Sequence, residues 1–283
     1  MEINELEKIA NGVRRSILDM VYHAGSGHLG GSLSAVEIMT ELYFSQMRID
    51  PRQPDWPLRD RFLLSKGHAT PVYYAVLAER GYFPKEELAG FRQMHSFLQG
   101  HPDRKHTPGV DMSTGSLGQG ISVAVGIALG AKITKQQFRT FVLLGDGEIQ
   151  EGQVWEALQF AGNHGLDNLT IILDNNHIQS DGTLREVNSP YPIDAKFRDF
   201  GLEVLNVDGH DFGQLEAAFR LARTIRGKPT AILAQTVKGK GISFMENQAA
   251  WHGKVPNEPQ YRQAIAELEA QAGKLENRME EKV

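Results

Sequence analysis

The sequence predicts an α/β protein with a mostly parallel central sheet and helices on both faces. Short apolar runs such as 140–144 and 169–173 end in glycine or polar turns, and segments with helical spacing of apolar residues separate them. Uninterrupted apolar strands are typical of a parallel sheet that is buried on both faces. The composition, 41% hydrophobic and 23% charged, suits a globular protein. No interior linker or internal repeat divides the chain, so residues 1–283 are expected to form a single domain.

The first part of the chain predicts two helices separated by a glycine-rich loop. Apolar residues from Ile9 to Val21 recur at helical spacing, and the loop at 25–31 interrupts them. Ser34 is the expected N-cap of the next helix, and Glu37 follows it by three residues, as in a capping box. A proline-rich connector at 51–57, a strand at 61–64 and a helix at 71–80 come next.

The rest of the chain repeats the order of strand, turn and helix. Parallel sheets bind ligands at the carboxyl ends of their strands, so the glycine and asparagine turns after Leu64, Leu144 and Leu173 mark the expected site. The other predicted strands are 202–207 and 230–237, and the predicted helices are about 153–163 and 212–225.

Two further helical segments have distinct compositions. Gly126 and Gly130 lie four residues apart in an apolar segment, and we expect them to let a helix press closely against the sheet. The segment at about 257–283 is rich in charge, particularly from Glu267 onward, and predicts a solvated helical tail.

Composition and charge exclude several classes of protein. The absence of cysteine excludes disulfide scaffolds, thiolate zinc sites, iron–sulfur clusters and cysteine nucleophiles. A formal net charge of −5 argues against a nucleic-acid-binding surface. The N-terminal segment lacks the apolar core of a secretory signal, and the longest uncharged stretch, 113–131, is too polar in its first half to span a membrane. We therefore expect a cytoplasmic protein with neither nucleic-acid nor membrane partners.

Two motif matches are poor candidates for a site. The glycines at 25–30 match the dinucleotide-binding fingerprint, but a predicted helix precedes them where that fingerprint requires a strand. His95, His101 and His106 suggest a zinc cluster, but their loop has no regular spacing that would set ligand geometry.

Asp146 and Asn176 form a more specific pattern. Asp146 lies between two glycines after one predicted strand, and Asn175-Asn176 ends the next strand 30 residues later. The intervening helix makes one crossover unit that brings both turns to the same edge of the sheet. One carboxylate and one amide oxygen are too few to hold Mg²⁺, which completes its octahedral shell with water and ligand phosphates. The pattern therefore indicates a diphosphate ligand, although acidic and asparagine turns are also common without any ligand.

Several longer segments, taken with this pattern, resemble the transketolase family in the family's order. The resemblance covers about residues 10–255. The segments are Ser26-Gly27-His28, Leu64-Ser65-Lys66-Gly67-His68, Gly100-His101-Pro102, Thr114-Gly115-Ser116-Leu117-Gly118-Gln119-Gly120 and Gly145-Asp146-Gly147-Glu148-Ile149-Gln150-Glu151-Gly152.

The resemblance implies thiamine diphosphate and magnesium as cofactors, with calcium or manganese as substitutes for the metal. The implied metal ligands are Asp146, Asn176 and the backbone oxygen of Ile178. The implied cofactor-binding residues are His68, Gly115, Leu117, Gly147, Asn176 and His252. The implied catalytic residues are His28, His101 and His252.

Two of these histidines, His28 and His101, would face the reacting sugar. An imidazole suits that role because it changes charge near neutral pH and donates or accepts according to its tautomer. Glu151 matches a family position in an acidic network at a subunit interface, although an acid at a helix N-terminus is also favoured by the helix dipole. Glu156 fits either interpretation equally well.

The length implies half of an enzyme. A complete transketolase is more than twice as long, and the family's activating glutamate, ring-stacking aromatic residue and phosphate-binding arginines lie in its second part. The chain is thus similar to the amino-terminal subunit of a split transketolase, which would be inactive without its separate carboxy-terminal partner and would form a heterotetramer of two plus two. This complex would transfer a ketol group from a ketose phosphate to an aldose phosphate.

Alternatives remain open at this point. They are a deoxysugar-phosphate synthase, a ketol transferase for unusual sugars and a non-catalytic cofactor-binding subunit. Leu29, Lys66 and Ser116 differ from residues that are frequent in the family, and the differences leave room for an altered acceptor preference.

Overall fold

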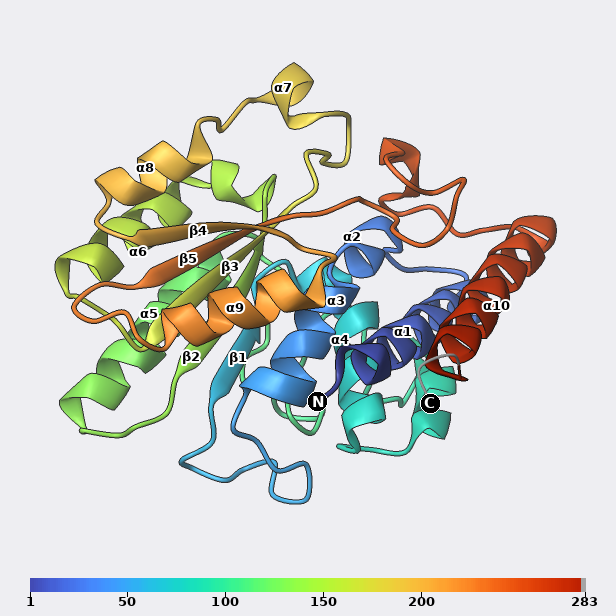
Figure 1. Cartoon of the computed structure of the whole chain (residues 1–283), viewed down its shortest axis with the longest axis horizontal. Helices are drawn as coiled ribbons and strands as arrows, with labels where there is room; N and C mark the ends of the chain where they lie inside the picture. The colour runs from blue at the N-terminus through green and yellow to red at the C-terminus, as the bar shows by residue number, and fades with distance from the viewer. Residues whose placement is uncertain (281–283) are drawn as a thin grey trace.

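The computed structural model describes residues 1–280 and contains a five-stranded parallel sheet (Figure 1). The strand order is β1-β2-β3-β5-β4, and every neighbouring pair is parallel. The predicted fold class is confirmed. The strands are β1 (Arg61–Leu64), β2 (Thr140–Gly145), β3 (Leu169–Asn175), β4 (Glu203–Asp208) and β5 (Thr230–Gln235).

The strand register brings the polar turns to one edge of the sheet. Gly145 at the end of β2 pairs with Asp174 of β3, and Asn175 pairs with Gln235 at the end of β5. The carboxyl ends of the three central strands, β2, β3 and β5, are therefore level. The turns that follow them consequently meet at one edge of the sheet, as expected.

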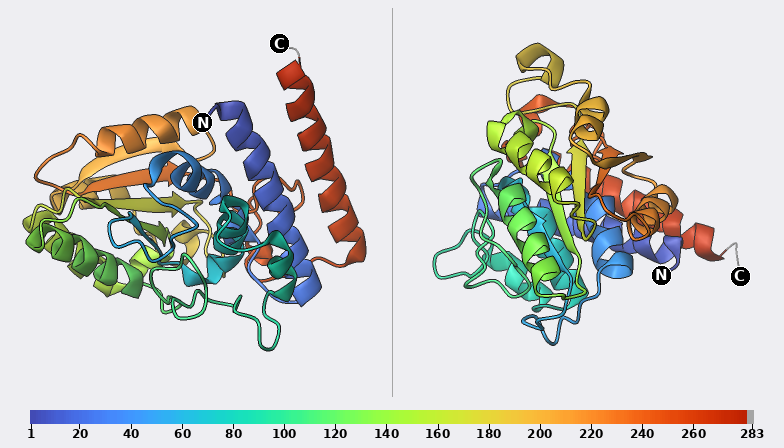
Figure 2. Two further views of the ribbon diagram at one scale, coloured as in Figure 1. Left: turned by 90° about the horizontal axis from the view of Figure 1, so that it is seen from below. Right: turned by 90° about the vertical axis from the view of Figure 1, so that its left-hand side faces the viewer.

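Helices cover both faces of the sheet (Figure 2). On one face the core includes residues of α1 (Ile3–Ala24), α2 (Gly30–Leu33), α3 (Val36–Glu41), α4 (Thr70–Arg80) and α9 (Phe212–Ala222). On the other it includes residues of α5 (Gln119–Ile133), α6 (Gly152–Asn163) and α8 (Ile193–Asp199). The remaining α-helices are α7 (Leu184–Val187) and α10 (Glu258–Glu280).

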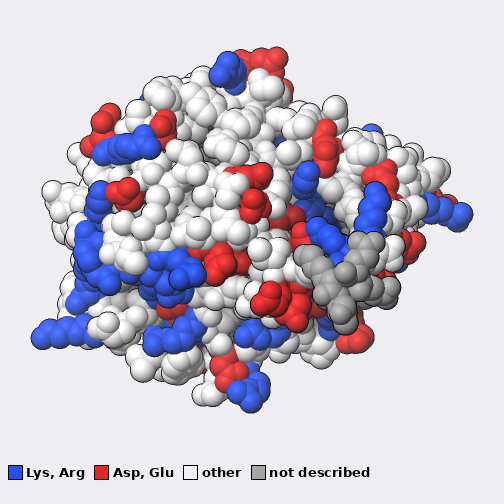
Figure 3. All heavy atoms as spheres, viewed as in Figure 1, with Lys and Arg blue, Asp and Glu red and all other residues white. Residues whose placement is uncertain are grey.

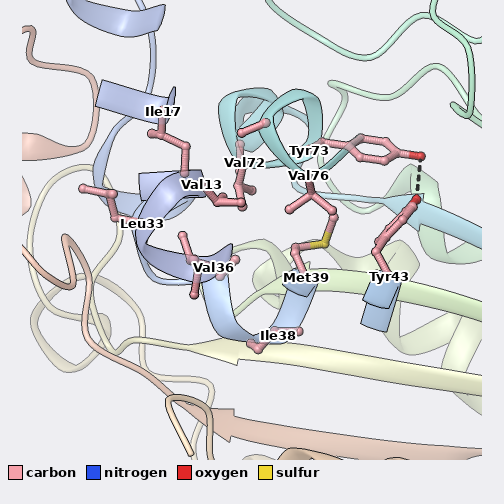
Figure 4. Close-up of a cluster of buried hydrophobic side chains, with 14 of the residues drawn as sticks. Val13, Ile17, Leu33, Val36, Ile38, Met39, Tyr43, Val72, Tyr73 and Val76 are labelled. Atoms are coloured by element: carbon pink, nitrogen blue, oxygen red, sulfur yellow. Dashed lines mark hydrogen bonds between the residues drawn. The ribbon is translucent and has the colours of Figure 1, made fainter. Parts of the chain in front are cut away.

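Aliphatic side chains of α1, α3 and α4 interlock in the first core, where the Tyr43 and Tyr73 hydroxyls lie 3.3 Å apart (Figure 4). The glycine loop at 25–31 is tied to the edge of the sheet by Lys66, which follows β1 and donates to the Gly31 oxygen, and by the backbone N–H of Gly239, which follows β5 and donates to the Gly30 oxygen. On the surface, basic and acidic side chains are interspersed over the face drawn in Figure 3.

The predicted N-cap at Ser34 is wrong. Ala35 is the N-cap of α3 and makes no side-chain cap bond, while the buried Ser34 hydroxyl donates to Oδ2 of Asp174. Glu37 is also not part of a capping box, because its carboxylate accepts from Arg14 and lies 2.9 Å from the His210 ring. Buried charged partners compete more strongly for these side chains than the helix terminus does.

The predicted role of the glycines in α5 is also wrong. Gly126 is exposed, and a Cβ built at Gly126 or Gly130 would meet no atom within 4 Å. The face of α5 that packs on the sheet instead carries Ile121, Ala124 and Ala128. Gly126 and Gly130 thus lie on a part of α5 that faces open space rather than the sheet.

The predicted solvated tail is only partly solvated. In α10, Ala264 and Leu268 are buried, and the backbone oxygen of Leu268 accepts from Asn11 of α1 over 2.9 Å. The Tyr261 ring stacks on Tyr22 at 3.9 Å. The apolar residues of α10 that pack on α1 lie among charged residues, so the high charge of the segment suggested a fully solvated helix. Residues 281–283 of the predicted helix lie outside the described part. Among residues 1–280, no helix combines the length and apolar character needed to cross a bilayer.

Candidate active site at the carboxyl edge of the sheet

A cavity of about 250 Å³ lies where the central strands end. Its walls come from the turns after β1, β2, β3 and β5 together with the glycine loop before α2. The lining residues are Gly31, Lys66, His68, Leu117, Gly145, Asp146, Gly147, Glu148, Gln150, Glu151, Asn176, Ile178, Gln179, Ser180, Lys238 and His252.

Asp146 is the central carboxylate of this cavity. Its Oδ1 accepts from the backbone N–H of Gly147 over 2.8 Å, and its Oδ2 accepts from the backbone N–H of His177. The turn after β2 is thereby tied to the turn after β3. Burial, with the nearby Asp174 carboxylate, raises the pKa of Asp146 to about 7. A cation at this carboxylate would lower that pKa and relieve the cost of burying the charge.

Asn176 and Ile178 place two more oxygens beside Asp146. The Asn176 Oδ1 accepts from the backbone N–H of Ile178 over 3.2 Å, which holds the loop in a tight turn. Within residues 1–280 no group of three His, Asp or Glu side chains is arranged to hold a metal. The predicted set of carboxylate, amide and carbonyl oxygens instead suits a hard cation whose shell is completed by a ligand. The residues present therefore fit magnesium together with a diphosphate.

Lys238 reaches the cavity from the turn after β5 and was not predicted. Its ammonium donates to the backbone oxygen of Ile178 over 2.9 Å and to Nδ1 of His252 over 3.1 Å. Burial lowers the pKa of Lys238 to about 8. The only signal for this lysine in the sequence was its place three residues after β5, at the same edge as the other turns.

Three predicted histidines meet in one cluster. The ring centroids of His28, His68 and His252 lie 5.0 to 5.3 Å from each other. Burial lowers the pKa of His28 and of His252 to about 4 and that of His68 to about 2, and cationic neighbours add to the effect. These imidazoles are therefore neutral at pH 7, and each is able to donate through one nitrogen and accept through the other.

His101 lies near this cluster but does not line the cavity. Burial and the Arg92 guanidinium lower its pKa. Arg92, which was not predicted, donates to the Ser26 hydroxyl over 2.7 Å and also lowers the pKa of His28. His28 and His101 thus share one cationic neighbour just outside the cavity, where the glycine loops of both residues approach.

The loop before α5 forms another wall. Leu117 lines the cavity, whereas Gly115 lies behind it, where a Cβ would be 2.9 Å from the His101 ring. Glu151 also lines the cavity and packs on Gly118. Glu156 lies on α6 and does not line it.

Lys66 and Asp174 form a buried ion pair beneath the cavity floor. Their side chains are 2% and 0% exposed. The Lys66 ammonium also donates to the Gly31 oxygen over 2.7 Å, and the Asp174 carboxylate accepts from Thr236 as well. Although burial raises the pKa of Asp174, Lys66 and these donors outweigh it and hold that pKa below its usual value. The pair connects the glycine loop to β1 and β3, which the sequence alone did not indicate.

This geometry agrees with the known proteins that the chain matches. A family model described as "Transketolase, thiamine diphosphate binding domain" matches residues 6–274. The chain belongs to the transketolase family. The chain matches the structure of the transketolase from Pichia stipitis with a TM-score of 0.89 at 32% identity, over 95% of its own length and 41% of that enzyme. It matches the transketolase from Campylobacter jejuni with a TM-score of 0.85 at 32% identity, over 99% of its own length and 49% of that enzyme. The similarity therefore extends over at least 95% of this chain but over less than half of the length of each of these two enzymes.

Two relatives have nearly the same length as this chain. One, from Clostridium sp. strain MSTE9, is named as a subunit of 6-deoxy-6-sulfo-D-fructose transketolase; it is 44% identical over 94% of this chain and 96% of its own length. The other, from Phocaeicola vulgatus, is named as a subunit of apulose-4-phosphate transketolase; it is 38% identical over 98% of each chain. Human transketolase is 42% identical, but only 43% of it is covered.

Proposed function

We propose that the chain is the amino-terminal subunit of a split transketolase, working in the cytoplasm with a separate carboxy-terminal subunit. The complex would transfer a two-carbon ketol group from a ketose phosphate to an aldose phosphate. The main support for the proposal is a single cavity at the carboxyl edge of the sheet. Candidate metal-ligating oxygens, the Lys238 ammonium and imidazoles line this cavity together. Relatives of nearly the same length that are named as subunits support the division into two chains.

The oxygen-lined wall would hold magnesium, with calcium or manganese as substitutes. Asp146, Asn176 and the Ile178 carbonyl would supply three ligands, and the diphosphate would supply others, because Mg²⁺ prefers six oxygens. Lys238 and His68 would neutralise and bind the diphosphate from the opposite wall, with Gly147 leaving room for it. Gly115 and Leu117 would support the rings.

The bound thiamine diphosphate would supply the nucleophile and electron sink for breaking and forming the carbon–carbon bond. The share of this chain is to position the sugar and move protons. His28, His101 and His252 would bind the carbonyl and hydroxyl oxygens of the sugar as neutral imidazoles. Their lowered pKa values favour this binding role, because a neutral imidazole donates a hydrogen bond through one ring nitrogen and accepts one through the other.

The proposed heterotetramer contains two copies of each chain. The open surface of α5 at Gly126 and Gly130, on a helix that contacts α6, supports a contact between two copies of this chain. Gly126 and Gly130 would permit close approach of a helix, and Glu151 at the start of α6 would lie at the same boundary. The carboxy-terminal subunit would complete each cavity with the residues that the family holds in its second part.

The test of this proposal is a comparison of the chain alone with the chain co-purified with its partner subunit. We expect consumption of xylulose 5-phosphate with an aldose phosphate acceptor only from the complex, and only with thiamine diphosphate and magnesium. Asp146→Ala should abolish magnesium-dependent cofactor binding. Full activity of the isolated chain would contradict the division into subunits, and activity of the Asp146→Ala complex would favour a non-catalytic role.

Transfer to or from an unusual sugar is the second candidate. It is favoured by the printed names of the two relatives of similar length, which refer to a sulfosugar and to apulose 4-phosphate. A panel of ketose donors separates this candidate from the first, and pyruvate as donor identifies a deoxysugar-phosphate synthase.

A further inference from the structure

Glu148 is a buried carboxylate of the cavity that the functions above do not use. It lies in the short helical turn after β2 and is 3% exposed. No Lys, Arg or His among the described residues lies within ion-pair distance of it. A buried charge without a close cation is costly unless several donors bind it, so its hydrogen bonds call for a functional explanation.

Three donors from three different segments converge on this carboxylate. Its Oε1 accepts from the Ser65 hydroxyl over 2.6 Å and from the backbone N–H of Gly118 over 2.9 Å. Its Oε2 accepts from the backbone N–H of Gly145 over 3.0 Å. Ser65 follows β1, Gly145 ends β2, and Gly118 ends the loop before α5. One side chain therefore connects the two strand ends with that loop.

The connected segments contribute to different parts of the cavity lining. The loop before α5 carries Leu117, where the cofactor rings are expected, while Gly145 directly precedes Asp146, where the metal and diphosphate are expected. The first turn of α5, which follows this loop, is packed tightly on the residue after β1, since a Cβ at Gly120 would lie 2.5 Å from the Ser65 hydroxyl oxygen. A change in the length or polarity of the Glu148 bridge would therefore move one wall relative to the other.

We propose that Glu148 is a positioning residue that sets the spacing between the ring-binding wall and the diphosphate-binding wall of the cavity. The inference rests on the proposed function, because that function decides which wall receives which part of the cofactor. It predicts that the affinity for thiamine diphosphate, which reaches both walls, depends strongly on Glu148. The affinity for pyrophosphate, which corresponds to the diphosphate part alone, should depend on Glu148 much less.

Glu148→Gln is the most informative change. The two carboxylate oxygens each accept from a backbone N–H, so either orientation of the amide would set its NH₂ group against one of these donors. Ser65→Ala is a milder second variant that removes one of the three bonds without adding a donor. Glu41→Gln is the matched control, because Glu41 is an equally buried glutamate, 1% exposed, that does not line the cavity.

The measurement is calorimetric titration of the complex of this chain with its carboxy-terminal subunit, with magnesium present, by thiamine diphosphate and separately by inorganic pyrophosphate. For Glu148→Gln we expect the affinity for thiamine diphosphate to fall about tenfold or more, since one unsatisfied hydrogen bond is worth about that factor. We expect the affinity for pyrophosphate to change less than about threefold. Ser65→Ala should act in the same direction with a smaller ratio, and Glu41→Gln should leave both affinities unchanged.

The outcomes separate this inference from the proposed function. Equal weakening of both ligands, or no weakening of either, by Glu148→Gln and Ser65→Ala would overturn the positioning role while leaving the proposed function intact. If Glu148→Gln does not fold, the ratio measured for Ser65→Ala decides. A wild-type complex that binds neither ligand would overturn the proposed function itself.

Discussion

The ammonium of Lys238 donates to the backbone carbonyl of Ile178 over 2.9 Å, so a cation that lines the cavity is hydrogen-bonded to a candidate metal ligand. This bond joins the turn after β5 to the turn after β3. It places a positive charge beside the oxygens at which the metal ion and the diphosphate are proposed to bind.

We expect Lys238→Met to weaken binding of magnesium pyrophosphate about 10- to 100-fold, because a hydrogen bond to a charged group contributes about 1.5–3 kcal/mol. In the wild type the affinity should fall as the pH rises above about 8, where the buried ammonium loses its proton. Lys240→Met is the control, since Lys240 lies two residues away and does not line the cavity. Equal affinities for the two variants would contradict the assignment.

The buried pair of Lys66 and Asp174 predicts a large effect on folding. Lys66→Met leaves the Asp174 charge buried without a cation, and we expect the free energy of unfolding to fall by about 3–5 kcal/mol. Lys132→Met removes a partner of a surface pair with Asp167, and its cost should be within about 1 kcal/mol. Urea denaturation of both variants measures the difference. Similar midpoints would show that the buried pair contributes no more than a surface pair.

The histidine cluster predicts loss of stability in acid. Burial holds the pKa of His28 and His252 near 4 in the folded chain, below the ordinary value of 6.5. Between these values the unfolded chain binds more protons than the folded chain, so the free energy of unfolding falls as the pH falls from about 6.5 to about 4.

The measurement is the urea midpoint at several pH values in that window. His252→Gln should reduce the slope, because the variant has one fewer group to protonate on unfolding. His164→Gln, an exposed histidine at the end of α6, is the control and should keep the wild-type slope. An identical slope for His252→Gln would indicate that His252 is not held neutral.

The open face of α5 predicts an effect on assembly alone. A Cβ built at Gly126 would meet no other described atom of the chain within 4 Å, so we expect Gly126→Arg to fold. The arginine should nevertheless prevent close approach of a second copy. It should not destabilise the helix, because arginine favours a helix over glycine by up to about 1 kcal/mol. Sedimentation velocity gives the oligomeric state. Gly12→Arg, which also has open space on a helix, is the control, and loss of association in both variants would contradict a specific α5 interface.

Some expectations from the sequence agree closely with the structure. The turns after Leu64, Leu144 and Leu173 do lie at one edge, because parallel strands with a crossover helix leave their carboxyl ends together. Asp146 and Asn176 line the same cavity for this reason. By contrast, Ser34 was expected to cap a helix and Gly126 to face the sheet. Local patterns favoured those roles, but the Ser34 pattern does not contain Asp174, which the fold brings from β3, and the spacing of the α5 glycines does not determine which side of the helix meets the sheet.

Strand order along the chain, turn positions and the candidate ligands are local properties, since hydrophobic spacing and turn chemistry act over a few residues. The roles of Lys238 and Glu148 and the pairing of Lys66 with Asp174 depend on where buried side chains meet. Lys66 and Asp174 are 108 residues apart, and Glu148 and Ser65 are 83 apart. A buried charge binds whichever donors the packing of the core places beside it, and packing at such separations is set by the entire fold. The sequence therefore located the site, whereas the electrostatics inside the site follow from the packed structure.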